Sequence, residues 1–229
     1  MFKSYFSYIH VFLVFLQTTC FGIYYSQSGQ DKFVNESFFK NIRSGIFIDI
    51  GAHSGIEISN TYFFETELGW SGICIEPIPE LFDELTSNRK CVCVQGCITD
   101  HAGTAEFIRF PGNRAWFSGL KEKYNPLLLK NLEEAYGFNE YELINVDCIT
   151  LNDLLEQHGI QHVNFLSIDT EGGEFDILSS LNFEKFQIDV ITVENNLGDN
   201  RFAELMNKKG FRFVKKLDQD LIFVHKDFK

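Results

Sequence analysis

Positive charge is scarce in this 229-residue chain, which has 20 lysines and arginines against 32 aspartates and glutamates. The formal net charge is −12. The densest basic cluster, Lys208-Lys209 with Lys215-Lys216, is small and brackets a late predicted strand. Proteins that bind a nucleic-acid backbone neutralise its phosphates with clustered basic side chains. We therefore expect no nucleic-acid partner.

The cysteines lack the spacing of a structural metal site. Cys91, Cys93 and Cys97 lie close together, but the chain has no Cys-x-x-Cys pair there, and only His101 is near enough in sequence to be a fourth ligand. Five of the six cysteines fall in or beside predicted strands or the apolar N-terminal run. We interpret them as buried, reduced thiols and predict no metal site.

Internal repeats and low-complexity tracts are also absent, and the length suits one α/β domain. Helical and strand patterns alternate, which predicts a mostly parallel sheet with helices on both faces. The last two strands predict an antiparallel strand near one edge. Strands are predicted at 45–50, 71–75, 91–97, 104–110, 141–148, 163–168, 188–193, 211–215 and 221–224, and helices at 31–40, 55–65, 80–87, 126–136, 151–158, 174–181 and 200–209.

The first predicted strand ends in a turn suited to a nucleoside cofactor. Candidate cofactor residues are Asp49, Gly51, Ala52 and Gly55 in this turn, and Glu76 at the end of the next strand. Small residues let the backbone approach a ligand, and a carboxylate at a strand end can bind both ribose hydroxyls. The dinucleotide fingerprint Gly-x-Gly-x-x-Gly is missing, and an acid opens the turn. Both observations favour S-adenosylmethionine, which carries an ammonium group, over NAD.

Two further residues extend this predicted site. Cys97 and Ile98 follow the third strand, where they would lie beside the adenine. The alternative for the acids is structural, with Asp49 or Glu76 capping a turn or helix.

Carboxylates also follow later strands, and we take Asp169, Glu171 and Glu194 as candidate catalytic residues. Methyl transfer is an in-line displacement, so the protein aligns the two reactants and removes a proton from a hydroxyl acceptor. One carboxylate could orient the acceptor while another takes the proton. Two alternatives remain open: the three could bind a divalent cation, or Glu171 and Glu174 could be acids favoured at a helix N-terminus. His53 is interpreted as a structural residue.

Five segments carry a resemblance to a known family: Ser26–Asp31, Phe47–Gly55, Ser59-Asn60-Thr61 with Glu65, Gly69–Pro77 and Phe165–Glu174. Together they resemble the FkbM family of methyltransferases over residues 26 to 224. The resemblance implies a class I, Rossmann-like fold with a seven-stranded sheet, S-adenosylmethionine as donor, and O-methylation of a saccharide or related small molecule. Pro111–Tyr141 matches least and is predicted to cover the strand ends as an acceptor pocket or lid.

The Ser59-Asn60-Thr61 and Gly69-Trp70 segments are also similar to Star-like proteins of animals, which share this domain and are linked to membrane trafficking. A membrane-tethered binding protein is therefore the alternative function. Retention of the acids and glycines named above favours a working cofactor site.

We predict a leader at residues 1–25 and one domain at residues 26–229. Lys3 precedes an uncharged run with an apolar centre at Ile9–Leu16. The run fits a signal peptide ending near Cys20-Phe21-Gly22, a membrane anchor, or a buried first helix. Because S-adenosylmethionine is made in the cytosol, we favour membrane association through residues 5–25, with the domain in the cytoplasm.

Overall fold

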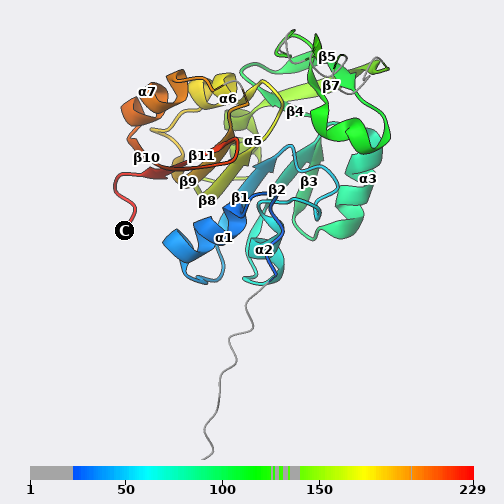
Figure 1. Cartoon of the computed structure of the whole chain (residues 1–229). Helices are drawn as coiled ribbons and strands as arrows, with labels where there is room; N and C mark the ends of the chain where they lie inside the picture. Colours follow the sequence, from blue (N-terminus) through cyan, green and yellow to red (C-terminus); the bar gives the residue numbers. More distant parts are fainter. Residues whose placement is uncertain (1–22, 125, 127–128, 131–133, 135–139, 197) are drawn as a thin grey trace, which may run out of the picture.

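The computed structural model describes residues 23–124, 126, 129–130, 134, 140–196 and 198–229 (Figure 1). Its largest feature is a seven-stranded sheet in the order β10-β11-β9-β8-β1-β2-β3. The strands are β1 (Ile46–Ile50), β2 (Ser71–Glu76), β3 (Val92–Gln95), β8 (His162–Ile168), β9 (Gln187–Glu194), β10 (Phe211–Leu217) and β11 (Asp220–His225).

The sheet confirms the predicted mostly parallel arrangement. β3, β2, β1, β8 and β9 pair in parallel, whereas β11 pairs antiparallel with both β9 and β10. The tight turn between β10 and β11 reverses the chain, so β11 enters between β9 and the edge strand. The predicted antiparallel strand near one edge is thus confirmed.

Helices cover both faces of this sheet, because successive strand residues point to opposite sides. On one face, Ile48 and Ile50 belong to a core formed with α5 (Leu151–Gln157), α6 (Glu174–Ser180) and α7 (Arg201–Lys208). On the other face, Phe47 belongs to a core formed with α1 (Gln30–Val34), the π-helical turn η1 (Asn35–Phe39), α2 (Tyr62–Thr66) and α3 (Pro79–Asn88).

A second, four-stranded sheet lies beyond β3 and has the order β4-β7-β5-β6. It comprises β4 (Cys97–Thr99), β5 (Gly103–Arg109), β6 (Gly119–Leu120) and β7 (Glu142–Thr150). A 3-10 helix, η2 (Gly112–Phe117), connects β5 to β6. The helix predicted at 126–136 falls mostly outside the described residues.

The sequence prediction of one strand at 91–97 is wrong, because the chain changes sheets at Gly96. Gly96 has φ +148°, and a Cβ there would lie 2.8 Å from the Asp147 carbonyl oxygen. The residues before Gly96 pair with β2, and those after it pair with β7. Cys97 and Ile98 consequently belong to the second sheet, directly beside the end of the first.

The prediction of a helix beginning at residue 55 is also wrong. Three residues with positive φ, His53, Gly55 and Ile58, interrupt the segment, and α2 begins only at Tyr62. Residues 51–61 instead form a loop, hereafter the 51–61 loop. Its apolar side chains are spaced as in a helix, but its polar side chains bond to the sheet: Thr61 to Asp49 on β1 and Asn60 to Ser167 on β8.

The predicted leader lies largely outside the described residues, which begin at Ile23. Tyr24 and Tyr25 already pack against the domain, with ring centroids 4.5 Å from Phe63 and 4.7 Å from Tyr62. Among the described residues, no helix combines the length and apolar character needed to cross a membrane.

Candidate active site

A cavity of about 570 Å³ opens at the carboxyl ends of the central strands. Ligands of open parallel sheets bind at this edge, where strand order reverses. Here β1 lies between β2 and β8, so the loops after these three strands face one another. Nearly all of the predicted site residues line this cavity: Asp49, Gly51, Ala52, Glu76, Cys97, Ile98, Asp169, Glu171 and Glu194.

The turn after β1 ties three strands together at the cavity floor. The Gly51 and Ala52 amides both donate to the Ile75 carbonyl on β2, at 3.1 and 3.0 Å, and the Asp169 amide donates to Ile50 at 2.9 Å. Gly51 has φ +86°, and a Cβ there would lie 1.8 Å from the Asp169 carbonyl oxygen. Only glycine permits this approach of two backbones.

Gly55 is the exception among the predicted cofactor residues, since it does not line the cavity. Its carbonyl accepts from Arg89, and a Cβ at Gly55 would lie 2.6 Å from Leu85 and 2.8 Å from Arg89. Gly55 therefore allows close packing of the 51–61 loop on α3 rather than close approach of a ligand.

Glu76 is held rigidly at the end of β2. Its side chain is buried, with the residue 4% exposed, and its two carboxylate oxygens accept from the backbone amides of His53 (3.0 Å) and Ile78 (2.9 Å). Burial raises the pKa of Glu76 to about 7, and the two amide bonds oppose this rise. Glu76 therefore organises two turns, as the structural interpretation predicted, and it also lines the cavity.

Asp49 is surrounded by hydroxyl groups from the 51–61 loop. Thr61 Oγ1 donates to Asp49 Oδ2 at 2.6 Å, and Asn60 donates to Ser167 Oγ at 3.0 Å on the neighbouring strand. Burial raises the pKa of Asp49, while the charge of Arg89 and the Thr61 bond lower it. Nothing in the sequence singles out Arg89, because it is an ordinary basic residue at the end of an amphipathic helix.

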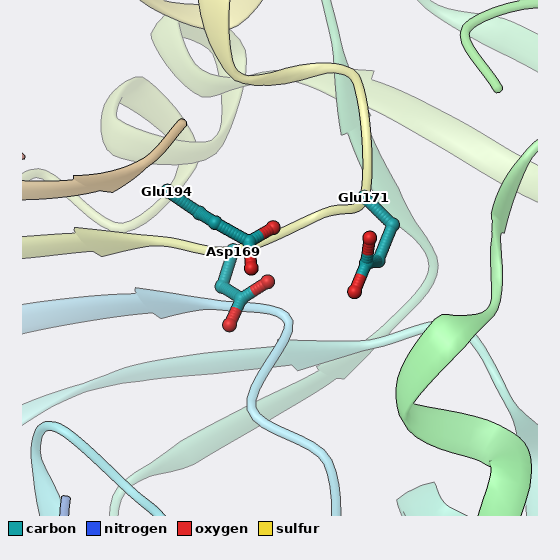
Figure 2. A group of neighbouring side chains, drawn as sticks. All are labelled: Asp169, Glu171 and Glu194. Atoms are coloured by element: carbon teal, nitrogen blue, oxygen red, sulfur yellow. The ribbon is translucent and has the colours of Figure 1, made fainter. Parts of the chain in front are cut away.

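The three predicted catalytic carboxylates converge on one space, as Figure 2 shows. Each of Asp169, Glu171 and Glu194 offers an oxygen, and these oxygens all lie within 4.8 Å of one another. The Glu171 carboxylate also accepts from Asn196 at 3.0 Å. This spacing would accommodate a divalent cation, a substrate hydroxyl, or a shared proton.

Mutual repulsion and burial control ionisation in this group, hereafter the carboxylate trio. Desolvation within the cavity raises the pKa of Asp169 to about 7 and that of Glu194 to about 12, although the Asp169 side chain itself is exposed to the cavity, and neighbouring carboxylates raise each further. Burial and Asp169 also raise the pKa of Glu171. Burial and the neighbouring carboxylates thus favour the protonated form of Glu194, which shares a hydrogen bond with Asp169.

Glu174 shapes the loop that carries Asp169 and Glu171. Its Oε1 accepts from the amides of Thr170 and Gly172 and from the Thr170 hydroxyl, all at 2.8–2.9 Å. Glu174 thus has the structural role at the start of α6 that the sequence analysis had considered for both glutamates. Glu171, with φ +59°, turns instead toward the cavity.

A pair of stacked rings, His53 and Trp116, forms part of the cavity lining. The His53 ring lies parallel to the Trp116 indole of η2, with centroids 3.4 Å apart and planes at 10°. Burial lowers the pKa of His53 to about 4, so the imidazole is neutral. The prediction that residues after 110 cover the strand ends agrees with this position, but nothing in the sequence singled out Trp116.

The charges of the cavity fit the proposed cofactor. Eight carboxylates line it, and no lysine or arginine does so among the residues that the structure describes. The buried Oδ1 of Asn60 has no partner within the described part of the chain. A ligand that brings ammonium and sulfonium groups would supply the missing positive charge and hydrogen-bond donors.

Comparisons with known proteins agree with this chemistry. The model of the methyltransferase FkbM domain matches residues 49–213. A curated relative, "Methyltransferase 1" of Beauveria bassiana (strain ARSEF 2860), is 28% identical over 153 residues, which cover 61% of each chain. This chain thus matches less than two thirds of that relative's length.

Solved structures with similar architecture have low sequence identity. One is a methyltransferase FkbM from Methylobacillus flagellatus KT, with a TM-score of 0.47 and 11% identity over 80% of this chain and 44% of the other. Another is a TehB-like SAM-dependent methyltransferase from Corynebacterium glutamicum ATCC 13032 Kitasato, with a TM-score of 0.45 and 9% identity over 88% and 89%.

Proposed function

Because this chain belongs to the FkbM family of methyltransferases, we propose that it transfers a methyl group from S-adenosylmethionine to a hydroxyl of a saccharide or related small molecule. The observation that carries this proposal is the placement of Asp49, Glu76 and the carboxylate trio around one cavity. The donor supplies an activated methyl group. The protein supplies alignment and proton removal.

In this proposal, Glu76 and Asp49 bind different parts of the cofactor. Glu76 accepts hydrogen bonds from the ribose hydroxyls, since it is fixed at the end of β2 by two backbone amides. Asp49 and the Gly51 turn hold the charged aminocarboxypropyl end. Cys97 and Ile98 contribute a mainly apolar wall for the adenine.

Asp169 is the proposed base for the acceptor hydroxyl. A general base works best with a pKa near the operating pH, and that of Asp169 is raised to about 7 by desolvation within the cavity and by nearby carboxylates. Glu194 keeps Asp169 in place through their hydrogen bond. Glu171, which faces the same space from the following loop, orients the acceptor.

The rest of the lining favours an uncharged, hydroxyl-rich acceptor. Side-chain amides of Gln27, Gln30, Asn196 and Gln219 line the cavity, and amides can both donate to and accept from sugar hydroxyls. The many carboxylates would repel phosphate or carboxylate groups on an acceptor. Neutral saccharides therefore fit better than sugar phosphates.

The test is a binding and transfer experiment on the full chain. Calorimetry should detect S-adenosylmethionine binding, and labelled methyl groups should then appear on neutral glycosides but not on the matching sugar phosphates. A parallel reaction with a chelator asks whether the carboxylate trio needs a divalent cation, and we expect turnover to persist. Cofactor binding without transfer to any glycoside would favour the Star-like binding function instead.

A further inference from the structure

We infer that Arg89, which does not line the cavity, is a positioning residue that keeps Asp49 ionised and oriented for the ammonium end of the cofactor, acting through the Thr61 hydroxyl. The inference rests on the proposed function for the identity of the ligand. The contacts that support the inference are all between residues of the protein, so they do not depend on the identity of the ligand.

The Arg89 side chain is fully buried behind the 51–61 loop, with 0% of its surface exposed. It follows the last residue of α3, so the helix fixes where the guanidinium enters the core. Its partners are the Glu65 carboxylate, the Gly55 carbonyl at 3.0 Å, Ser59 Oγ at 3.4 Å and Thr61 Oγ1 at 3.0 Å. A lysine could not reach this many acceptors with fixed geometry.

The link to the cavity is a single hydroxyl. Thr61 Oγ1 accepts from Arg89 Nη2 and donates to Asp49 Oδ2 at 2.6 Å. Thr61 is itself 0% exposed, so water cannot replace it. The hydroxyl therefore has one orientation, with its proton toward Asp49, and this polarity stabilises the carboxylate form.

The groups around Asp49 explain why a nearby cation matters for its ionisation. The titratable groups near it are Arg89 from the end of α3, Asp169 from the end of β8 and the Cys74 thiol on β2. Burial favours the protonated form of Asp49, and a protonated acid could not pair with an ammonium. Arg89 is the cation that opposes this effect of burial.

Placing this cation behind the loop has a functional consequence. A guanidinium inside the cavity would compete with the cofactor's ammonium for Asp49 and would repel its sulfonium. Behind Thr61, the same charge acts on Asp49 while the cavity keeps its negative potential. Arg89 also lies 5.2 Å and 5.5 Å from the ring centroids of Phe47 and Tyr62, which shield it from solvent.

Two sets of variants distinguish the hydrogen-bonded chain from Arg89 through Thr61 to Asp49, hereafter the relay, from simple packing. Thr61→Val preserves shape but removes the hydroxyl, and Thr61→Ser restores it. Arg89→Met paired with Glu65→Gln removes the charge without leaving Glu65 as an unpaired buried anion. Lys90→Met is the matched control, since it removes a neighbouring charge from an exposed side chain.

The first readout does not need the cofactor. Carbon NMR titration of the Asp49 carboxyl, identified with Asp49→Asn and recorded in an Asp169→Asn background, should give a higher pKa in Thr61→Val and in the double variant than in the parent. Thr61→Ser and Lys90→Met should match the parent. Equal Asp49 titration in all of these proteins would overturn the inference, whatever the ligand is.

The second readout is calorimetric titration with S-adenosylmethionine between pH 5.5 and 8.5. We expect Thr61→Val to weaken binding about 10-fold, the effect of one hydrogen bond to a charged group, with a larger loss at low pH. No binding by the parent protein would refute the proposed function and leave the NMR result as the test of the relay. Thr61→Val binding as tightly as the parent at every pH would refute the role of Arg89 toward the cofactor.

Discussion

Glu76→Gln tests the ribose contact, because it replaces one carboxylate oxygen and removes the negative charge while preserving side-chain shape. Both oxygens of Glu76 already accept from backbone amides, at 3.0 and 2.9 Å. The ribose hydroxyls would bind the remaining lone pairs of the same oxygens. The glutamine carbonyl oxygen still accepts, but the NH2 group cannot, so Glu76→Gln loses the backbone and ligand contacts of one of the two oxygens.

The expected loss follows from the hydrogen bonds. A hydrogen bond to a charged group contributes about 1.5–3 kcal/mol, so losing one from the ribose should weaken cofactor binding by about 10- to 150-fold. Glu76→Ala removes every such contact and should weaken binding further. Since only ionised Glu76 can accept from both hydroxyls, and burial raises its pKa to about 7, parent affinity should rise as the pH increases through about 7.

Calorimetry with two ligands makes the test specific. A cofactor analogue without the 2′ and 3′ hydroxyls should bind the parent weakly, and Glu76→Gln should bind this analogue with little further loss, because the interacting pair is already broken. Glu80→Gln is the control, since Glu80 lies outside the cavity lining but contributes a nearby negative charge. Unchanged affinity of Glu76→Gln for the full cofactor would refute the ribose assignment.

Three more predictions concern the base, the pH dependence of stability and the glycine turn. Asp169→Asn should leave cofactor affinity within about 3-fold of the parent but lower turnover by about 100-fold or more, measured by methyl incorporation; equal turnover would exclude Asp169 as the base. Because the folded-state pKa values of Glu76 and Asp169 are raised to about 7, folding takes up protons, so the melting temperature of the cofactor-free protein should fall from pH 6.5 to 8. His53, whose pKa is lowered from 6.5 to about 4, has the opposite effect only at lower pH; a flat profile above pH 6.5 would contradict the raised values. Gly51→Ala should lower the melting temperature more than Gly69→Ala, since both positions have positive φ but only at Gly51 would the added Cβ lie 1.8 Å from a backbone oxygen. Equal losses would argue against that close approach.

The architecture of the large sheet was predictable because it depends on local patterns. Short apolar strands such as Phe47–Ile50 and Phe165–Ile168 are buried on both faces, and amphipathic helices alternate with them along the chain. Carboxylates at the ends of parallel strands must share one edge of the sheet. That rule alone placed Asp49, Glu76, Asp169 and Glu194 together.

The failures occurred where backbone conformation overrides side-chain pattern. The apolar spacing after Gly55 resembles a helix, but positive φ at His53 and Ile58 and the bonds from Thr61 to Asp49 favour a loop. Likewise, Gly96 divides an apparently continuous strand, because its conformation lets the chain leave one sheet for another.

The sequence by itself determined which residue types stand at the strand ends, and hence the class of ligand that a negatively charged sheet edge can bind. Only the tertiary structure decided the role of each residue: Gly55 packs on a helix, Glu174 holds a loop, and Trp116 stacks on His53. Arg89 illustrates the reason. Its contacts reach back 24 to 34 residues along the chain, and no local pattern specifies which distant groups a buried guanidinium will meet.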